Sequence, residues 1–270
     1  MLIDVHGRAT HVRVQGPPDA PVLLLLHALG ANLTIWDRPA EALARTLRVV
    51  RYDLRGHGQS APGPATDTAP LTIELLAHDA LAVLDALGID DTHVGGVSVG
   101  GMVAQAIAAA APQRVRSLTL CNTLPLFPAP VRAMWRERAG QVRAHGLAPL
   151  ADAIVSRWVT PATFATPASR RLRHMLGATV PATYAAGAEA IAACDLRQST
   201  AAIRAPTLVL AGDSDLATPA DAVAAMAATI HGARFTLLAQ AAHLPMLEQP
   251  LAVSQAMQDF LADLKEPTMD

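Results

Sequence analysis

The 270-residue sequence has few aromatic residues, almost no lysine and little cysteine. The two cysteines, Cys121 and Cys194, stand alone, without the CxxC or Cys/His spacing of a metal site or the density of a disulfide framework. Lys265 is the single lysine, and arginine supplies the remaining basic residues. The net charge of −2 gives no basic face for a nucleic-acid backbone. We therefore expect neither a structural metal nor a nucleic-acid partner.

Charged residues are also scarce, at 16% against 51% hydrophobic residues, which excludes a disordered chain and leaves enough length for a sizeable core. The N-terminus lacks a charged stretch followed by a long apolar run, so we expect no signal peptide. Polar residues or prolines interrupt each apolar run before it reaches the length of a membrane span. A protein without a membrane contact, in the cytoplasm by default, is expected.

Short apolar runs alternate with helical patterns along most of the chain. Residues 2–15 are typical of a hairpin that turns at residues 6–8. Continuous apolar runs of strand length suit strands buried on both faces of a parallel sheet, and they occupy residues 22–26, 48–52, 93–97, 117–121, 207–211 and 234–239. Residues 72–87 and 100–111 show helical spacing. The alternation predicts an α/β fold with a mostly parallel central sheet flanked by helices.

Residues 124–203 break this alternation. They contain no convincing strand, and prolines at positions 125, 128, 130, 149, 161, 167 and 181 separate short helical patterns. Trp135 and Trp158 lie in those patterns. We expect residues 124–203 to form a helical lid inserted into a single core domain made of residues 1–123 and 204–270.

The motif Gly96-Val97-Ser98-Val99-Gly100 stands between a predicted strand and a predicted helix. That is the context of a nucleophile elbow, in which a strained turn projects a serine hydroxyl from the sheet. Glycine is needed on both sides of the serine because the flanking backbone approaches closely. The helix N-terminus adds positive potential and free N–H groups for a developing oxyanion. An ordinary glycine-rich turn would explain the five residues alone, but their placement favours Ser98 as a nucleophile.

A serine hydroxyl needs a base to take its proton, and in this type of site an acid and then a histidine follow the serine in the chain. His243, after the last predicted strand, is the candidate base. Asp213 and Asp215 compete to orient its imidazole. Asp213 directly follows a glycine and suits a turn cap, whereas Asp215 lies farther round the loop and is freer to reach the histidine. We favour Asp215.

Two backbone N–H groups are expected to bind the oxyanion. Val99, the residue after the nucleophile, supplies one, and Leu29, in the loop after the first buried strand, supplies the other. We interpret His27, which begins that loop, as a brace for it. His57 lies in the polar, glycine-containing stretch of residues 53–60, which we expect to fix a loop by hydrogen bonds rather than to take part in the chemistry.

Together these motifs resemble the α/β-hydrolase superfamily over nearly the whole chain, and within it most of all the 3-oxoadipate enol-lactonases. The narrower resemblance rests on short blocks of the core and the lid, which are residues 28–30 leading to Trp36, residues 47–60, 120–123, 151–154 leading to residues 157–158, 195–197, 203–212 and 217–219. It implies that a Ser-His-Asp triad opens a small, carboxylate-bearing enol-lactone (3-oxoadipate enol-lactone to 3-oxoadipate) through an acyl-enzyme and without a cofactor.

The resemblance further implies a cationic or polar group in the lid for the carboxylate of the substrate. Candidate residues are Arg132, Arg136, Arg138 and Arg157. Trp135 either lines the pocket or packs in the lid.

Other hydrolases on the same scaffold are alternatives: a carboxylesterase, a carbon–carbon bond hydrolase or a cofactor-free perhydrolase. A dehalogenase or epoxide hydrolase needs a carboxylate nucleophile, and Ser98 argues against both. A ligand-binding receptor with a vestigial site is a further alternative, which the complete set of serine, aspartate and histidine disfavours. The expected partner is a small ester or lactone, and the oligomeric state stays open.

Overall fold

The computed structural model describes residues 1–62 and 70–264, so Lys265 lies outside the described residues. An eight-stranded sheet forms its centre, with the strand order β1-β2-β4-β3-β5-β6-β7-β8. The strands are β1 (Leu2–Val5), β2 (Arg8–Gln15), β3 (Val22–Leu26), β4 (Arg48–Tyr52), β5 (Thr92–Val97), β6 (Val115–Cys121), β7 (Thr207–Gly212) and β8 (Arg234–Leu238). The β1–β2 and β2–β4 pairs are antiparallel and all later pairs are parallel. The predicted mostly parallel α/β sheet is confirmed.

The register of the parallel strands brings their carboxyl ends to one edge of the sheet. Leu26 pairs with Gly96, and Val97 pairs with Cys121. Farther along, Gly212 at the end of β7 pairs with the end of β8. The loops that leave these strands therefore meet at one edge, where open α/β sheets bind their ligands.

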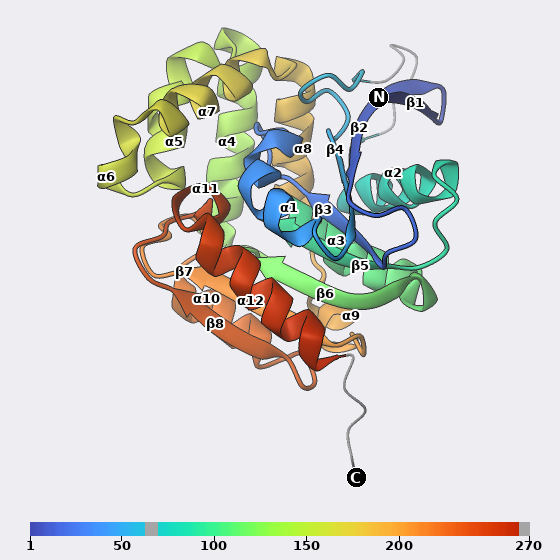
Figure 1. The fold of residues 1–270 in the computed structure, drawn as a ribbon. Coiled ribbons are helices and arrows are strands. Elements are labelled where there is room, and N and C mark those ends of the chain that lie inside the picture. Colours follow the sequence, from blue (N-terminus) through green and yellow to red (C-terminus); the bar gives the residue numbers. More distant parts are fainter. Residues whose placement is uncertain (63–69, 265–270) are drawn as a thin grey trace.

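Helices cover both faces of the sheet (Figure 1). The α-helices of the described residues are α1 (Asp37–Leu43), α2 (Ile73–Ala86), α3 (Val99–Ala110), α4 (Ala129–His145), α5 (Ala151–Trp158), α6 (Pro161–Phe164), α7 (Pro167–Ala178), α8 (Pro181–Ala193), α9 (Arg197–Ala201), α10 (Ala220–Ala227), α11 (Pro245–Glu248) and α12 (Pro250–Asp263). Helix α1 packs against α12 on one face, and α2 packs against α3 on the other. Strands β3 and β7 lie between these layers of helices and are buried. This burial on both faces explains why their residues form continuous apolar runs.

Helices α4–α8 come between β6 and β7 in the sequence and form a group of their own in space, at the upper left of Figure 1. Within it, α4 packs against α8 and α5 packs against α7. No strand interrupts residues 122–206, all of which the structure describes. We refer to α4–α8 as the lid. The division of the chain at residues 124 and 203 stays a prediction.

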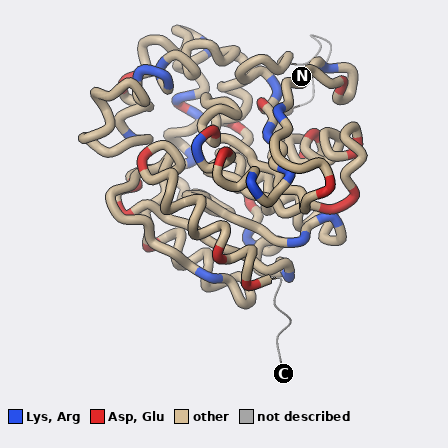
Figure 2. Tube along the Cα trace, viewed as in Figure 1, with Lys and Arg blue, Asp and Glu red and all other residues tan. Residues whose placement is uncertain are grey.

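None of the helices that the structure describes is long and apolar enough to cross a membrane. Basic and acidic residues are interspersed along the described part of the chain, as the coloured trace in Figure 2 shows. Such interspersed charge is typical of a surface without a single-sign field.

Candidate active site

Ser98 lies in the turn between β5 and α3, in a backbone conformation that L-residues rarely adopt. Its φ is 57° and its ψ is −121°. The Ser98 N–H donates to the carbonyl of Cys121 at 3.0 Å. The Ser98 carbonyl accepts from the N–H of Met102 at 3.1 Å and from Thr123 Oγ1 at 2.8 Å. These bonds hold the strained strand-to-helix turn that exposes a serine side chain.

Glycines flank Ser98 because no side chain fits there. A Cβ at Gly96 would lie 2.2 Å from the carbonyl oxygen of Gly100. A Cβ at Gly100 would lie 2.5 Å from the carbonyl oxygen of Leu26. Both contacts are with backbone, which cannot yield without moving β3 or α3. The sequence motif therefore has a steric cause in the packing of β5, α3 and β3.

His243 and Asp215 form a buried pair in the loops that follow the last two strands. Nδ1 of His243 lies 2.7 Å from Oδ2 of Asp215, and the two side chains are 4% and 0% exposed. Thr218 Oγ1 donates to the same oxygen at 2.5 Å, and the N–H groups of Ala217 and Thr218 donate to Oδ1. Burial alone would raise the pKa of Asp215, but His243 and these hydrogen bonds outweigh it and lower the pKa. The carboxylate is thus ionised and aimed at Nδ1.

Asp213 has a different environment. It is exposed, and its carboxylate accepts from the N–H of Gln240 at 3.0 Å and of Ala241 at 3.3 Å. The backbone bond from Gln240 is the main reason that its pKa is lowered. Asp213 therefore ties the loop after β7 to the loop after β8, and Asp215 alone of the two contacts His243.

Asn122, which sequence reasoning gave no role, joins the ends of β6 and β7 to the segment of His243. Its Nδ2 donates to the carbonyls of Ala242 at 2.8 Å and His243 at 3.0 Å. Its Oδ1 accepts from the N–H of Gly212 at 2.9 Å. The side chain is fully buried. A polar residue directly after the buried strand β6, at the carboxyl edge of the sheet, is the signal in the sequence that would have found it.

His27 begins the loop after β3 and is fully buried. Its Nδ1 lies 2.8 Å from the carbonyl oxygen of Ala28, and its Nε2 lies 2.8 Å from the N–H of Leu54. Burial lowers the pKa of His27 more than Asp53 and the bond to Ala28 raise it. The neutral ring therefore braces the loop that carries Leu29, whose own side chain packs against α8 at Gly187.

His57 packs beside His27, with ring centroids 5.3 Å apart. Its Nδ1 lies 2.9 Å from the carbonyl oxygen of Arg55, so the ring fixes the loop after β4. Burial, and then the neighbouring His27, lower the pKa of His57 to about 3. His57 is not among the residues that line the cavity at Ser98.

A cavity of about 160 Å³ lies between the sheet edge and the lid. Ser98 and His243 line it from the core, together with Leu29. The lid side is largely apolar and contributes Val131, Met134, Trp135, Ile154 and Trp158, together with Arg138 and Arg157, and Phe127 lines the cavity from the segment before α4. The nucleophile candidate, the histidine and the loop of Leu29 therefore share one enclosed space.

Residues 21–250 match the model of the alpha/beta hydrolase fold family. The chain belongs to the α/β-hydrolase fold family. It is 31% identical to 3-oxoadipate enol-lactonase 1 of Acinetobacter baylyi over 98% of this chain and 97% of that protein. It is 28% identical to a putative carbamate hydrolase of Azorhizobium caulinodans over 98% of this chain and 96% of that protein. The solved enol-lactonase of Burkholderia xenovorans superimposes with a TM-score of 0.91 at 34% identity, over 97% of this chain and all of that one. The protein is thus an enzyme of this hydrolase family.

The lid arginines of this α/β-hydrolase lie in different surroundings. Arg138 lines the cavity, and its guanidinium carbon is 4.9 Å from the ring centroid of Trp135. Burial raises the pKa of Tyr184, and the positive charge of Arg138 partly offsets this rise. Arg157 also lines the cavity and donates from Nη2 to the carbonyl of Leu216 at 2.6 Å. Arg132 and Arg136 are not among the lining residues, and Arg136 is exposed.

Helical spacing explains which residues of α4 reach the cavity. Val131, Met134, Trp135 and Arg138 line it, at positions i, i+3, i+4 and i+7 of one helix face. That stripe is present in the sequence and would have separated Arg138 from Arg136. The indole Nε1 of Trp135 is buried and has no hydrogen-bond partner among the described residues.

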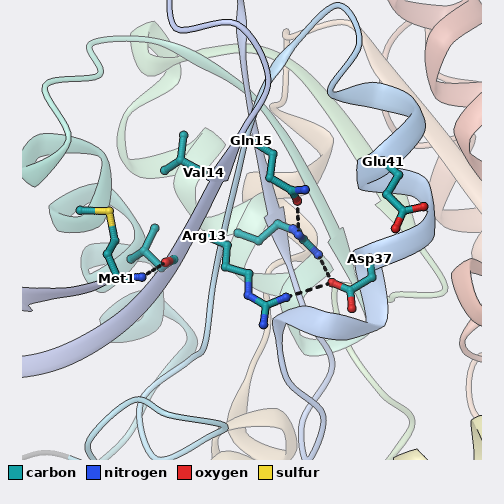
Figure 3. A pocket seen from close by; sticks show the side chains of 8 residues that line it. Met1, Arg13, Val14, Gln15, Asp37 and Glu41 are labelled. Atoms are coloured by element: carbon teal, nitrogen blue, oxygen red, sulfur yellow. Dashed lines mark hydrogen bonds and ion pairs between the residues drawn. The ribbon is translucent and has the colours of Figure 1, made fainter.

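A second cavity, of about 470 Å³, lies away from this site between β2 and α1 (Figure 3). Asp37 accepts from Arg51 at 2.6 Å and pairs with Arg13 at 3.5 Å, and Gln15 accepts from Arg51. Its arginines, Arg13 and Arg51, are paired with Asp37, and neither Ser98 nor His243 lines it. Within the described residues, no three His, Cys, Asp or Glu side chains gather as a metal site requires.

Proposed function

We propose that this hydrolase opens a small lactone that carries a free carboxylate, with 3-oxoadipate enol-lactone as the substrate. The enol-lactonases among its relatives support this substrate. The observation that carries the proposal is the composition of the cavity: mostly apolar walls, a serine and a histidine at one end, and the guanidinium of Arg138 in the lid. A cation in an apolar cavity favours a substrate with a compensating negative charge.

In this mechanism Ser98 attacks the lactone carbonyl and His243 takes the proton from its hydroxyl. Asp215 keeps Nδ1 of the imidazole protonated, which leaves Nε2 free as the base, and then stabilises the imidazolium. The N–H groups of Val99 and Leu29 bind the oxyanion of the tetrahedral intermediate. Val99 opens α3, so the positive end of that helix adds to the stabilisation.

Collapse of the intermediate breaks the ring C–O bond. The imidazolium of His243 gives its proton to the departing enol oxygen, and the enol becomes a ketone. The acyl group stays on Ser98, tethered to the rest of the product. A water molecule, deprotonated by His243, then attacks the ester carbonyl, and the proton returns to Ser98 as the second carboxylate leaves. Lactone and water thus yield one oxo-dicarboxylate, and no cofactor takes part.

Arg138 is the proposed receptor for the carboxylate outside the ring. Charge-assisted hydrogen bonds from a guanidinium to a carboxylate are stronger than neutral ones. The unpartnered Nε1–H of Trp135 adds a second donor on the same helix face. The contact of Arg138 with the Trp135 ring keeps both groups in a fixed arrangement.

The deciding experiment compares kcat/KM for 3-oxoadipate enol-lactone with that for neutral esters of similar size. We expect a clear preference for the lactone and loss of both activities in Ser98→Ala with the fold intact. A kcat/KM no better for the lactone would leave a carboxylesterase, a carbon–carbon bond hydrolase or a perhydrolase. Binding of the lactone without product release would instead indicate a receptor.

A further inference from the structure

Glu248, the last residue of α11, connects the lid to the segment that carries His243. Its Oε1 accepts from the N–H of Thr160 at 2.8 Å and from Thr160 Oγ1 at 2.7 Å. Its Oε2 accepts from the N–H of Ala242 at 2.8 Å. Thr160 immediately precedes α6 of the lid, whereas Ala242 precedes His243 in the core. One carboxylate therefore bridges the two parts of the molecule.

The same turn of the lid has further bonds to the core. The carbonyl of Trp158 accepts from the N–H of Leu244 at 3.1 Å. Arg157 donates to the carbonyl of Leu216, next to Asp215. We call residues 157–160 the lid turn. It is bonded both to the segment of His243 and to the segment of Asp215.

The backbone around His243 is thus held from two sides. From the core, Asn122 binds the carbonyls of Ala242 and His243. On the other side, the N–H of Ala242 donates to Glu248, which is itself bonded to Thr160 of the lid turn. The N–H of Leu244 donates to the carbonyl of Trp158 in the lid turn. Both N–H groups that flank the histidine consequently depend on how the lid turn is seated.

We propose that Glu248 is a positioning residue that makes the orientation of His243 depend on the lid. The inference rests on the proposed role of His243 as the base. Arg157 and Trp158 of the lid turn line the cavity, so a bound substrate contacts the turn. A substrate that seats the lid turn keeps Glu248 bound to Thr160 and Ala242, and this arrangement holds the imidazole between Asp215 and Ser98. Glu248 itself is not among the residues that line the cavity.

The variant Glu248→Gln tests this role because an amide cannot replace a carboxylate that accepts at both oxygens. Its NH₂ group would face either the N–H of Ala242 or the donors of Thr160. We expect kcat to fall by roughly 10- to 100-fold, the range for a slight misplacement of a catalytic group, with KM changed by less than about threefold. Glu189→Gln is the matched control, because Glu189 is an exposed lid residue paired with Arg143 on the surface.

Thr160→Val removes only the hydroxyl donor and keeps the N–H and the side-chain shape. If Glu248 acts through the lid turn, the kcat losses caused by Glu248→Gln and by Thr160→Val are not additive. The double variant then has the same kcat as Glu248→Gln alone. Additive losses would overturn the coupling to the lid. If Glu248→Gln does not fold, Thr160→Val decides alone: a fall in kcat at constant KM supports the proposal, and wild-type kcat overturns it.

Proton NMR separates positioning from a merely structural effect. The Nδ1–H of His243, bonded to Asp215, gives a resonance far downfield, which we expect to shift or broaden in Glu248→Gln and to stay unchanged in Glu189→Gln. An unchanged resonance with reduced kcat would overturn the proposal. Measuring turnover with p-nitrophenyl acetate makes the test independent of the natural substrate. Failure to open the lactone then refutes the proposed function and leaves this inference testable.

Discussion

The backbone N–H of Leu54 points at Nε2 of His27, 2.8 Å away. Nε2 is therefore the acceptor, and the ring proton lies on Nδ1, which donates to the carbonyl oxygen of Ala28. That carbonyl belongs to the same planar trans peptide as the N–H of Leu29, and the two groups point in opposite directions. By holding one, His27 fixes the direction of the other, which is the proposed second oxyanion donor.

We therefore predict that His27→Asn, whose shorter side chain cannot reach both partners, lowers kcat by about 100-fold, the usual effect of losing one oxyanion donor. KM should change little, since the donor acts on the transition state. Steady-state kinetics with a p-nitrophenyl ester measure the effect, and His231→Asn on the surface is the control. Wild-type kcat in His27→Asn would contradict the assignment of this brace.

The buried, neutral His57 should lower the free energy of unfolding in mild acid. Burial holds its pKa at about 3 in the folded protein, whereas the unfolded chain protonates it below about pH 6.5. Between these values the unfolded state binds the additional proton, so the free energy of unfolding falls as the pH falls, by up to about 1.4 kcal/mol per pH unit. His57→Asn retains an N–H donor for Arg55 and does not titrate. Urea unfolding from pH 7 to pH 4.5 should show a shallower slope for this variant, and an equal slope would refute the prediction.

The two aspartates after β7 should differ sharply in their effect on rate. Asp215→Asn leaves the packing intact but allows the wrong tautomer of His243, so we expect kcat to fall by about 10⁴-fold. Asp213→Asn removes bonds to Gln240 and Ala241 at the surface and should change kcat far less. Kinetics of both variants with one ester substrate decide between them. The opposite order of effects would transfer the role to Asp213.

Gly100→Ala should destabilise the protein, because the new Cβ would meet the backbone of β3. We expect the free energy of unfolding to fall by roughly 1–3 kcal/mol, the range for overpacking a rigid interior. Gly140→Ala is the control, since nothing lies within 4 Å of a Cβ at that position of α4. There the change should stabilise the helix by about 0.5–1 kcal/mol. Urea unfolding measures both, and equal stability of Gly100→Ala would refute the steric argument.

Arg138→Met should affect carboxylate-bearing substrates selectively. Loss of a charge-assisted hydrogen bond should lower kcat/KM for the lactone by roughly 10- to 100-fold. Neutral esters should be affected much less. Arg136→Met removes an exposed arginine from the same helix and should leave both substrates unchanged. If Arg138→Met lowers activity equally on neutral esters, the residue supports the lid rather than the carboxylate.

The sequence predicted most closely the limits of strands that are buried on both faces. The expectation of burial was wrong for residues 234–239, because β8 is an edge strand and most of its residues are exposed. Residues 22–26 and 48–52 were expected as strands and form β3 and β4 at those limits. The start of β6 was missed by two residues, because Arg116 is exposed within it and interrupts the apolar run. Helices α1 and α10, of seven and eight residues, were not predicted. Helices this short owe their stability to tertiary packing rather than to propensity.

For the candidate site, chain order and local motif led to Ser98, which directly follows β5, and to His243, which lies in the loop after β8. They did not suffice for residues that act through distant partners. The bonds of the Asn122 side chain reach residues 90 to 121 positions away in the sequence. Glu248 bonds Ala242, six positions away, and also Thr160, 88 positions away. Only the sheet register and the docking of the lid bring those partners together, and neither is contained in a local pattern.

The three tryptophans of the chain give this site built-in optical reporters. Trp135 and Trp158 line the cavity, one from α4 and the other from the lid turn. Trp36 is fully buried and donates from Nε1 to the carbonyl of Leu26 at 3.0 Å, beside His27. Because Trp36 does not line the cavity, its emission forms a background to that of the other two tryptophans. Changes in intrinsic fluorescence on ligand binding will therefore report on the lid and the cavity, without an added dye.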